Sequence, residues 1–177
     1  MKCEKQVTLI LENAQKINDL HIALKESKET TFDEKKVKHA AEQFHRLYDQ
    51  LAFPGGLQAG MALLKKNDAS ITELAITYLE ANPYFFRSGY IKEEIAHILK
   101  RAPLSQDQKE RLYKVLLSSA SDKDQRKWKA YCNLATVIAN SDFCTQLNTS
   151  IAHAADQGIR EHLSDMHDAI LKVKKTQ

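Results

Sequence analysis

The densest group of potential metal ligands in the chain is the segment REHLSDMHD, residues 160–168. On a helix, Glu161 and Asp165 share one face, as do His162 and Asp165, because side chains three or four residues apart are neighbours. Mixed histidine and carboxylate ligands at such spacings can bind zinc or iron. The segment contains neither the Glu-x-x-His motif of di-iron bundles nor H-E-x-x-H. A solvated polar helix face explains these residues better, and we predict no metal site and no cofactor.

A second candidate is the segment LAFPGGLQAG, residues 51–60, which contains three of the five glycines in the chain. A phosphate-binding loop of the G-x-x-x-x-G-K-[ST] type follows a strand, and its backbone N–H groups and lysine hold the phosphates. Here Gly60 is followed by MALLKK, and the residues before the glycines have a helical pattern. Pro54 can stop one helix, and Gly55 and Gly56 permit a chain reversal. We therefore predict a break between two helices and not a phosphate site.

No catalytic residue can be assigned from local spacing. Cys132 lies on an apolar helical stripe, which favours an unreactive core thiol over a nucleophile. The partners in a Ser/His/Asp or Cys/His site meet in space and not in sequence. An enzyme whose site is built from scattered residues, such as His97, Tyr131 and the 160–168 segment, is therefore one alternative function.

The most distinctive segment is NPYFFRSGYIKEEIAHILKR, residues 82–101, where four aromatic side chains fall within seven positions beside basic ones. If helix pairs stack, the basic residues here and those near 126–129 would form a stripe. Aromatic and arginine side chains are the usual anchors of protein interfaces. The same residues could instead hold phosphates and stack on bases. In a third interpretation, the aromatic side chains fill the junction between helix pairs and the charges are only solvated.

We expect a surface near residues 84–92 and 123–129 to bind another protein, with nucleic acid as the alternative partner. The residues predicted to contact this partner are Phe85, Phe86, Arg87, Tyr90, Lys92, Arg126, Lys127 and Lys129.

The elements that must position these residues are helices. Glycine and proline are scarce, at five and three residues, and apolar side chains recur at spacings of three and four. Helix-start signals of the capping-box type occur at TFDE (31–34), SITE (70–73) and SQDQ (105–108). A further helix is expected to begin at either Asn82-Pro83 or Ser88-Gly89. The sequence predicts about nine helices, no strand and an all-α fold.

The spacing of helix starts suggests repeats. Starts at Ser70, Ser105 and Ser141 could each open a helix pair. The number of residues between successive starts, 35 and then 36, is typical of stacked helical-pair repeats. By helix length and period, residues 68–175 resemble HEAT-like and related α-solenoid proteins. This resemblance implies antiparallel helix pairs in a partial right-handed solenoid, with a concave binding face. A compact irregular helical bundle is the alternative architecture.

The domain expected is a single all-helical one over 1–177, in which a hairpin over 5–52 caps the repeats. The net charge is only +3, from 26 basic and 23 acidic residues, which is small for a dedicated nucleic-acid binder. The three cysteines form no CxxC pair, and neither a signal peptide nor a membrane span is recognisable. We therefore expect a cytoplasmic, non-enzymatic scaffold or adaptor that binds a protein and no membrane.

Overall fold

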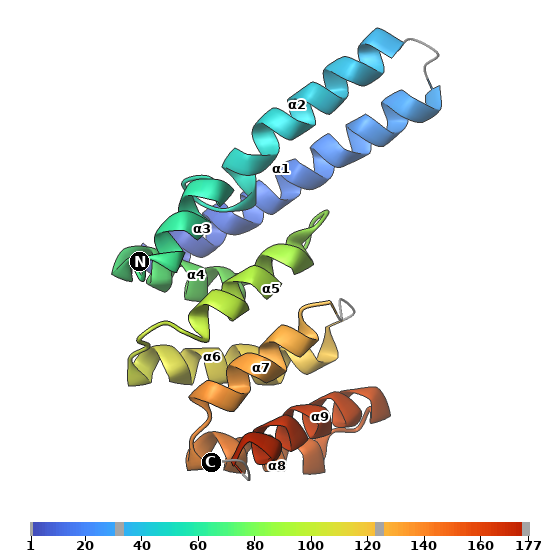
Figure 1. The fold of residues 1–177 in the computed structure, drawn as a ribbon. Coiled ribbons are helices and arrows are strands. Elements are labelled where there is room, and N and C mark those ends of the chain that lie inside the picture. Colours follow the sequence, from blue (N-terminus) through green and yellow to red (C-terminus); the bar gives the residue numbers. More distant parts are fainter. Residues whose placement is uncertain (1, 31–33, 123–125, 175–177) are drawn as a thin grey trace. The chain divides into compact units, whose positions relative to one another are not determined.

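The computed structural model describes residues 2–30, 34–122 and 126–174, and within these ranges the chain is all-α, as predicted, with no strand (Figure 1). The helices are α1 (Lys2–Thr30), α2 (Glu34–Ala52), α3 (Leu57–Lys65), α4 (Ala69–Ala81), α5 (Ser88–Leu99), α6 (Gln106–Ser118), the short 3-10 helix η1 (Ser119–Ser121), α7 (Trp128–Ile138), α8 (Ser141–His153) and α9 (Gln157–Lys174).

The chain divides into two compact units, Met1–Ser88 and Gly89–Gln177. Each unit has its own helices and its own buried apolar side chains. The expectation of a single domain, with a hairpin over 5–52 that caps repeats over 68–175, stays a prediction.

In the first unit, α1 and α2 run side by side, α4 packs against α1, and α3 bridges α2 and α4 (Figure 1). Burial of one face of each helix against the others is the main source of stability in such an arrangement. The largest buried side chains of this core include Ile17, Phe44, Phe53, Leu64 and Tyr78.

The glycine-rich segment breaks the chain between α2 and α3, as predicted. Gly55 and Gly56 have backbone φ angles of 85° and 95°, which residues other than glycine rarely adopt. The N–H of Gly56 donates to the carbonyl of Phe53 at 2.9 Å, and Asp49 Oδ1 accepts the N–H of Gln58 at 3.0 Å. The first free N–H groups of α3 are thus partly satisfied by the protein itself, and the turn has a structural explanation.

Close packing also accounts for the third glycine of the segment. A Cβ atom on Gly60 would lie 2.5 Å from Cδ1 of the Phe53 ring, well inside van der Waals contact. That ring is fully buried and lies against the ring of Tyr78, with 5.4 Å between the centroids. Only a glycine lets α3 approach Phe53 this closely.

In the second unit, α6 packs against α7 and α8 against α9, while α6 also contacts α8 and α7 contacts α9. The rings of Tyr113 in α6 and Phe143 in α8 stack with 4.4 Å between their centroids. The Tyr113 hydroxyl donates to the carbonyl of Ile138 in α7 at 2.6 Å. These contacts join one helix pair to the next. The resemblance to HEAT-like solenoids stays a prediction.

The helix-start signals have mixed outcomes. Ser105 forms the predicted capping box, since its hydroxyl accepts the N–H of Gln108 and the Gln108 side chain accepts the N–H of Ser105. The prediction for Ser70 was wrong, because the N-cap of α4 is Asp68. The Asp68 carboxylate accepts the N–H groups of both Ser70 and Ile71 at 3.0 Å. The TFDE signal lies outside the described residues for all but its last position.

Candidate functional site

The site is built around residues 82–87, the loop that connects α4 to α5. Asn82 ends α4 in the left-handed conformation with a φ of 45°, and Arg87 has a φ of 69° immediately before α5 begins at Ser88. A left-handed asparagine is a common way for a helix to end, whereas an arginine in this conformation is uncommon. Of the two helix starts considered from the sequence, the one at Ser88 is confirmed.

Ser88 closes this loop on itself. Its hydroxyl accepts the N–H of Phe85 at 3.2 Å, and its own N–H donates to the carbonyl of Phe85 at 2.9 Å. The Ser88 side chain is buried. These two hydrogen bonds hold the loop in one tight turn.

Two side chains from the α1–α2 hairpin attach the loop to the rest of the first unit. Asn18 Nδ2 donates to the carbonyl of Tyr84, and the Tyr48 hydroxyl donates to the carbonyl of Phe86, both at 3.0 Å. Burial raises the pKa of the Tyr48 hydroxyl, while the charge of Arg87 opposes this rise. Tyr48 therefore keeps its proton, and its role as a donor, at neutral pH.

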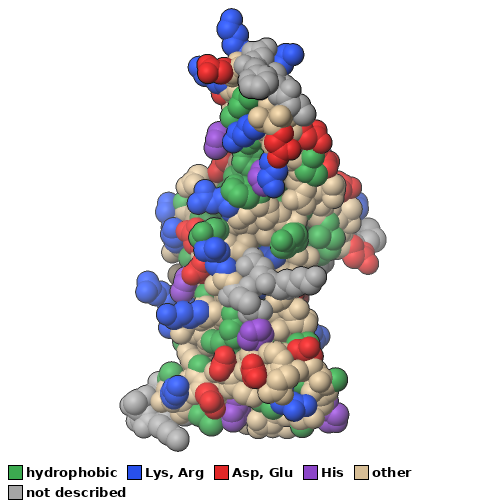
Figure 2. Space-filling model, turned by 90° about the vertical axis from the view of Figure 1, so that its right-hand side faces the viewer, with side chains coloured by type: hydrophobic (Ala, Val, Ile, Leu, Met, Phe, Trp, Pro, Cys, Tyr) green, Lys and Arg blue, Asp and Glu red, His purple; other side chains and the backbone are tan. Residues whose placement is uncertain are grey.

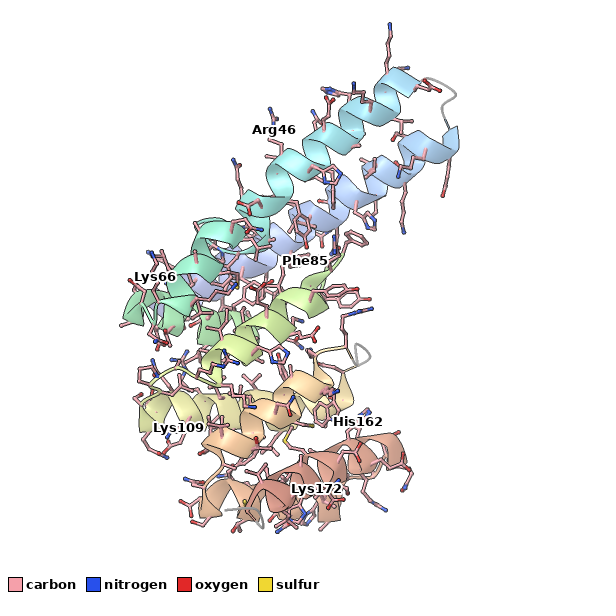
Figure 3. The ribbon with its side chains drawn as sticks, in the orientation of Figure 1. Arg46, Lys66, Phe85, Lys109, His162 and Lys172 are labelled. Atoms are coloured by element: carbon pink, nitrogen blue, oxygen red, sulfur yellow. The ribbon has the colours of Figure 1, made fainter. Side chains whose placement is uncertain are left out.

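Neighbouring residues of the loop differ in how far their side chains are buried. Phe85, labelled in Figure 3, is buried, and its ring lies 6.2 Å from that of Tyr48. Tyr84 and Phe86 are 75% and 44% exposed, and Arg87 is exposed as well. The loop therefore uses one aromatic side chain as an internal anchor and presents two others to the outside.

The exposed ring of Phe86 rests on the hairpin. Its centroid lies 4.5 Å from that of the His21 ring and 6.1 Å from that of Phe44, which is buried. Burial lowers the pKa of His21, and the charges of Lys25 and Lys28 lower it further. The rings of Phe86 and His21 thus form an aromatic patch, and Tyr84 is exposed on the same loop. Figure 2 shows, on the face that it displays, small groups of hydrophobic side chains between charged ones.

The second unit carries a smaller exposed group. Tyr90 is 45% exposed, and the guanidinium carbon of Arg126 lies 4.1 Å from the centre of its ring, in a cation–π geometry. Lys129 is also exposed. Tyr90, Arg126 and Lys129 are therefore accessible, as the sequence interpretation requires.

Two of the lysines assigned to the basic stripe are not accessible. Lys92 and Lys127 are both buried. The Lys127 ammonium pairs with the Asp122 carboxylate at 2.5 Å and lies 5.6 Å from the centre of the Tyr131 ring. Its charge is thus satisfied inside the unit, which the linear sequence does not reveal. The continuous stripe expected from spacing alone therefore lacks these two members, and residues 123–125 lie outside the described part of the chain.

The other candidate chemistry has structural explanations. His162 Nδ1 lies 3.0 Å from the carbonyl oxygen of Ala120, and its ring lies 5.2 Å from that of Trp128. Burial, followed by the charge of Asp165, raises the pKa of the Cys132 thiol to about 12, which disfavours the reactive thiolate. In the parts of the chain that the structure describes, no three His, Cys, Asp or Glu side chains come together as a metal site.

Comparison of the chain with known proteins gives no further guide to this site. No family model, curated protein or solved structure matches it. The helices that the structure describes include none long and apolar enough to cross a membrane. The candidate site must therefore be argued from its own residues.

The sequence interpretation located the exposed aromatic residues of the site but missed the residues that position them. Asn18 and Tyr48 lie 66 and 38 positions away from their hydrogen-bond partners. No local spacing could identify them. The apolar spacing over residues 37–51 places Tyr48 on the apolar face of its helix, but it does not identify the carbonyl to which Tyr48 donates.

Proposed function

We propose that the chain is a helical scaffold that binds another protein, and that the loop over 82–87 is the principal contact. Tyr84, Phe86 and Arg87 are the contact residues in the first unit. The exposed residues Tyr90, Arg126 and Lys129 provide a second, smaller contact group in the second unit.

The observation that carries this proposal is the restraint of an exposed aromatic loop. Two side-chain hydrogen bonds from α1 and α2, the hydrogen bonds between Ser88 and Phe85, and the burial of Phe85 restrain its backbone. Exposed aromatic side chains that lie close together are a common feature of protein-binding surfaces. A loop that is already ordered loses little conformational entropy on binding, so more of the contact energy becomes affinity.

The chemistry of the exposed side chains favours a protein over a nucleic acid. Tyrosine and arginine are enriched among the residues that dominate protein interfaces. A nucleic-acid groove needs a row of accessible cations along the backbone path, and two lysines expected in such a row, Lys92 and Lys127, are buried.

The test is a comparison of wild type with Phe86→Ala and Tyr84→Ala in capture from a lysate of the source organism, with and without nuclease. Each retained protein is then purified, and its binding to the three chains is measured by calorimetry. We expect nuclease-resistant binding that Phe86→Ala weakens by roughly thirty-fold, corresponding to about 2 kcal/mol for an interface anchor.

A matched control is Leu171→Ala, which removes an exposed apolar side chain of the second unit outside both contact groups. This variant should bind as wild type does. Equal binding by Phe86→Ala and wild type would refute the assignment of the loop. Binding that nuclease abolishes would favour a nucleic-acid partner instead.

A further inference from the structure

The face of α1 beside the aromatic patch carries basic side chains. His21, Lys25 and Lys28 are spaced by four and three residues, which places them on one face of the helix. Lys25 and Lys28 are exposed, and neither forms an ion pair with any described residue. The one carboxylate a turn from Lys25 on the same helix, Glu29, is also exposed and forms no ion pair with it.

Arg87 adds a third cation at the loop. It follows Phe86 directly in the chain, and its guanidinium is close enough to the Tyr48 hydroxyl to act on its titration. The charges that act on His21 are likewise those of Lys25 and Lys28. Lys25 and Lys28 thus act on His21 within the aromatic patch, and Arg87 acts on the Tyr48 hydroxyl that supports the loop. The same stretch of α1 also carries the exposed Glu26 and Glu29.

We propose that the partner segment bound at this loop is acidic and carries an apolar side chain, which covers the Phe86 and His21 rings while its carboxylates face Lys25, Lys28 and Arg87. This inference rests on the proposed function and adds the chemistry of the partner. Charge complementarity of this kind sets which partner binds and how fast it associates. Lys25 and Lys28 have no carboxylate partner among the described residues, so the pairing of these two lysines with the bound segment breaks no ion pair of theirs.

The experiment pans a phage-displayed library of random peptides against the full chain. We expect selected peptides to contain aspartate or glutamate beside an aromatic or branched aliphatic residue. Synthetic copies of these peptides are then titrated against wild type, against Phe86→Ala, and against the double variant Lys25→Glu with Lys28→Glu. The charge control is Arg101→Glu with Lys114→Glu, which changes the net charge equally at exposed positions of the second unit.

The expected result is a loss of affinity of roughly tenfold or more for the Lys25→Glu, Lys28→Glu chain, since exposed ion pairs contribute up to about 1 kcal/mol each and reversal adds repulsion. The charge control should retain the affinity of wild type. Raising the salt concentration should weaken wild-type binding, whereas in the double variant it should screen the repulsion between the introduced glutamates and the acidic peptide and so relieve part of the loss.

Three results overturn the inference in different ways. Peptides without excess acid that lose affinity with Phe86→Ala, but not with the lysine reversal, would refute the acidic partner and leave the proposed function intact. Peptides that bind Phe86→Ala and wild type alike, or no enrichment at all, would refute both. Displacement of the peptides by an oligothymidylate at low concentration would indicate that the face prefers phosphates.

Discussion

Replacement of Gly60 by alanine is expected to destabilise the protein, although alanine is the better helix former. Gly60 lies within α3, where the change alone should gain about 0.5–1 kcal/mol from helix propensity. The added Cβ would lie 2.5 and 2.7 Å from two carbons of the Phe53 ring. That ring is fully buried against Tyr78 and cannot turn toward solvent.

Forcing one extra carbon into a packed core costs about 1–3 kcal/mol. The net loss expected for Gly60→Ala is therefore roughly 0–2.5 kcal/mol, centred on about 1 kcal/mol, which urea unfolding followed by far-ultraviolet circular dichroism can resolve. The neighbouring change Ala59→Gly is the control, because Ala59 is exposed on the same helix and reports helix propensity alone. The Ala59→Gly chain should lose about 1 kcal/mol of unfolding free energy.

A second variant tests the cause. Phe53→Leu removes the ring that the new Cβ would meet, so the two changes together should cost less than the sum of their separate costs, by about 0.5–3 kcal/mol. A Gly60→Ala chain that is more stable than wild type would refute the close contact between α3 and Phe53. If the losses of unfolding free energy in Gly60→Ala and Phe53→Leu simply add in the double variant, the cost of Gly60→Ala does not come from contact with the Phe53 ring.

Three further predictions concern charges and the thiol. Asp122→Asn should lower the free energy of unfolding by roughly 2–4 kcal/mol, because it removes a carboxylate from the buried Lys127 ammonium. The fluorescence of Trp128 reports this unfolding. Lys127→Met should cost less, and equal losses for the two variants would contradict this reasoning. Cys132 should react with iodoacetamide at pH near 8 only after unfolding, measured by peptide mass spectrometry, because its pKa is about 12 when folded. Folding lowers the pKa of His21 below its ordinary 6.5, so the folded chain binds this proton less readily than the unfolded chain does, and stability should fall as the pH drops from about 7 to about 5. His21→Gln should lessen that fall in urea titrations, and an identical pH profile would refute the assignment.

The helices were predictable because their signals are local. The capping box of Ser105 needs only a residue three positions away, and the break at Gly55 needs only the residues beside it. The error at Ser70 has a local cause too. Asp68, two positions earlier, has a carboxylate that accepts hydrogen bonds from the Ser70 hydroxyl and from two backbone N–H groups. A charged acceptor at that position competes successfully with a serine hydroxyl.

The candidate site was only partly predictable, because burial within it is decided by distant residues. Phe85 and Phe86 are adjacent and chemically identical, yet one is buried and the other exposed. Which of them turns inward depends on the left-handed backbone of the loop and on its hydrogen bonds to the hairpin. In the same way, the burial of Lys127 depends on a carboxylate and a ring that the sequence does not mark as its partners.

The hydrogen bonds from Asn18 and Tyr48 have a consequence for how this loop can evolve. Both end on main-chain carbonyls, so they recognise the path of the backbone and not the identity of residues 84 and 86. Every amino acid supplies the same carbonyl, and the two presented side chains can therefore be exchanged while their support is kept. If the loop binds a partner as proposed, substitution at these two positions alone would change that partner, and the loop could serve as a fixed frame for new binding residues.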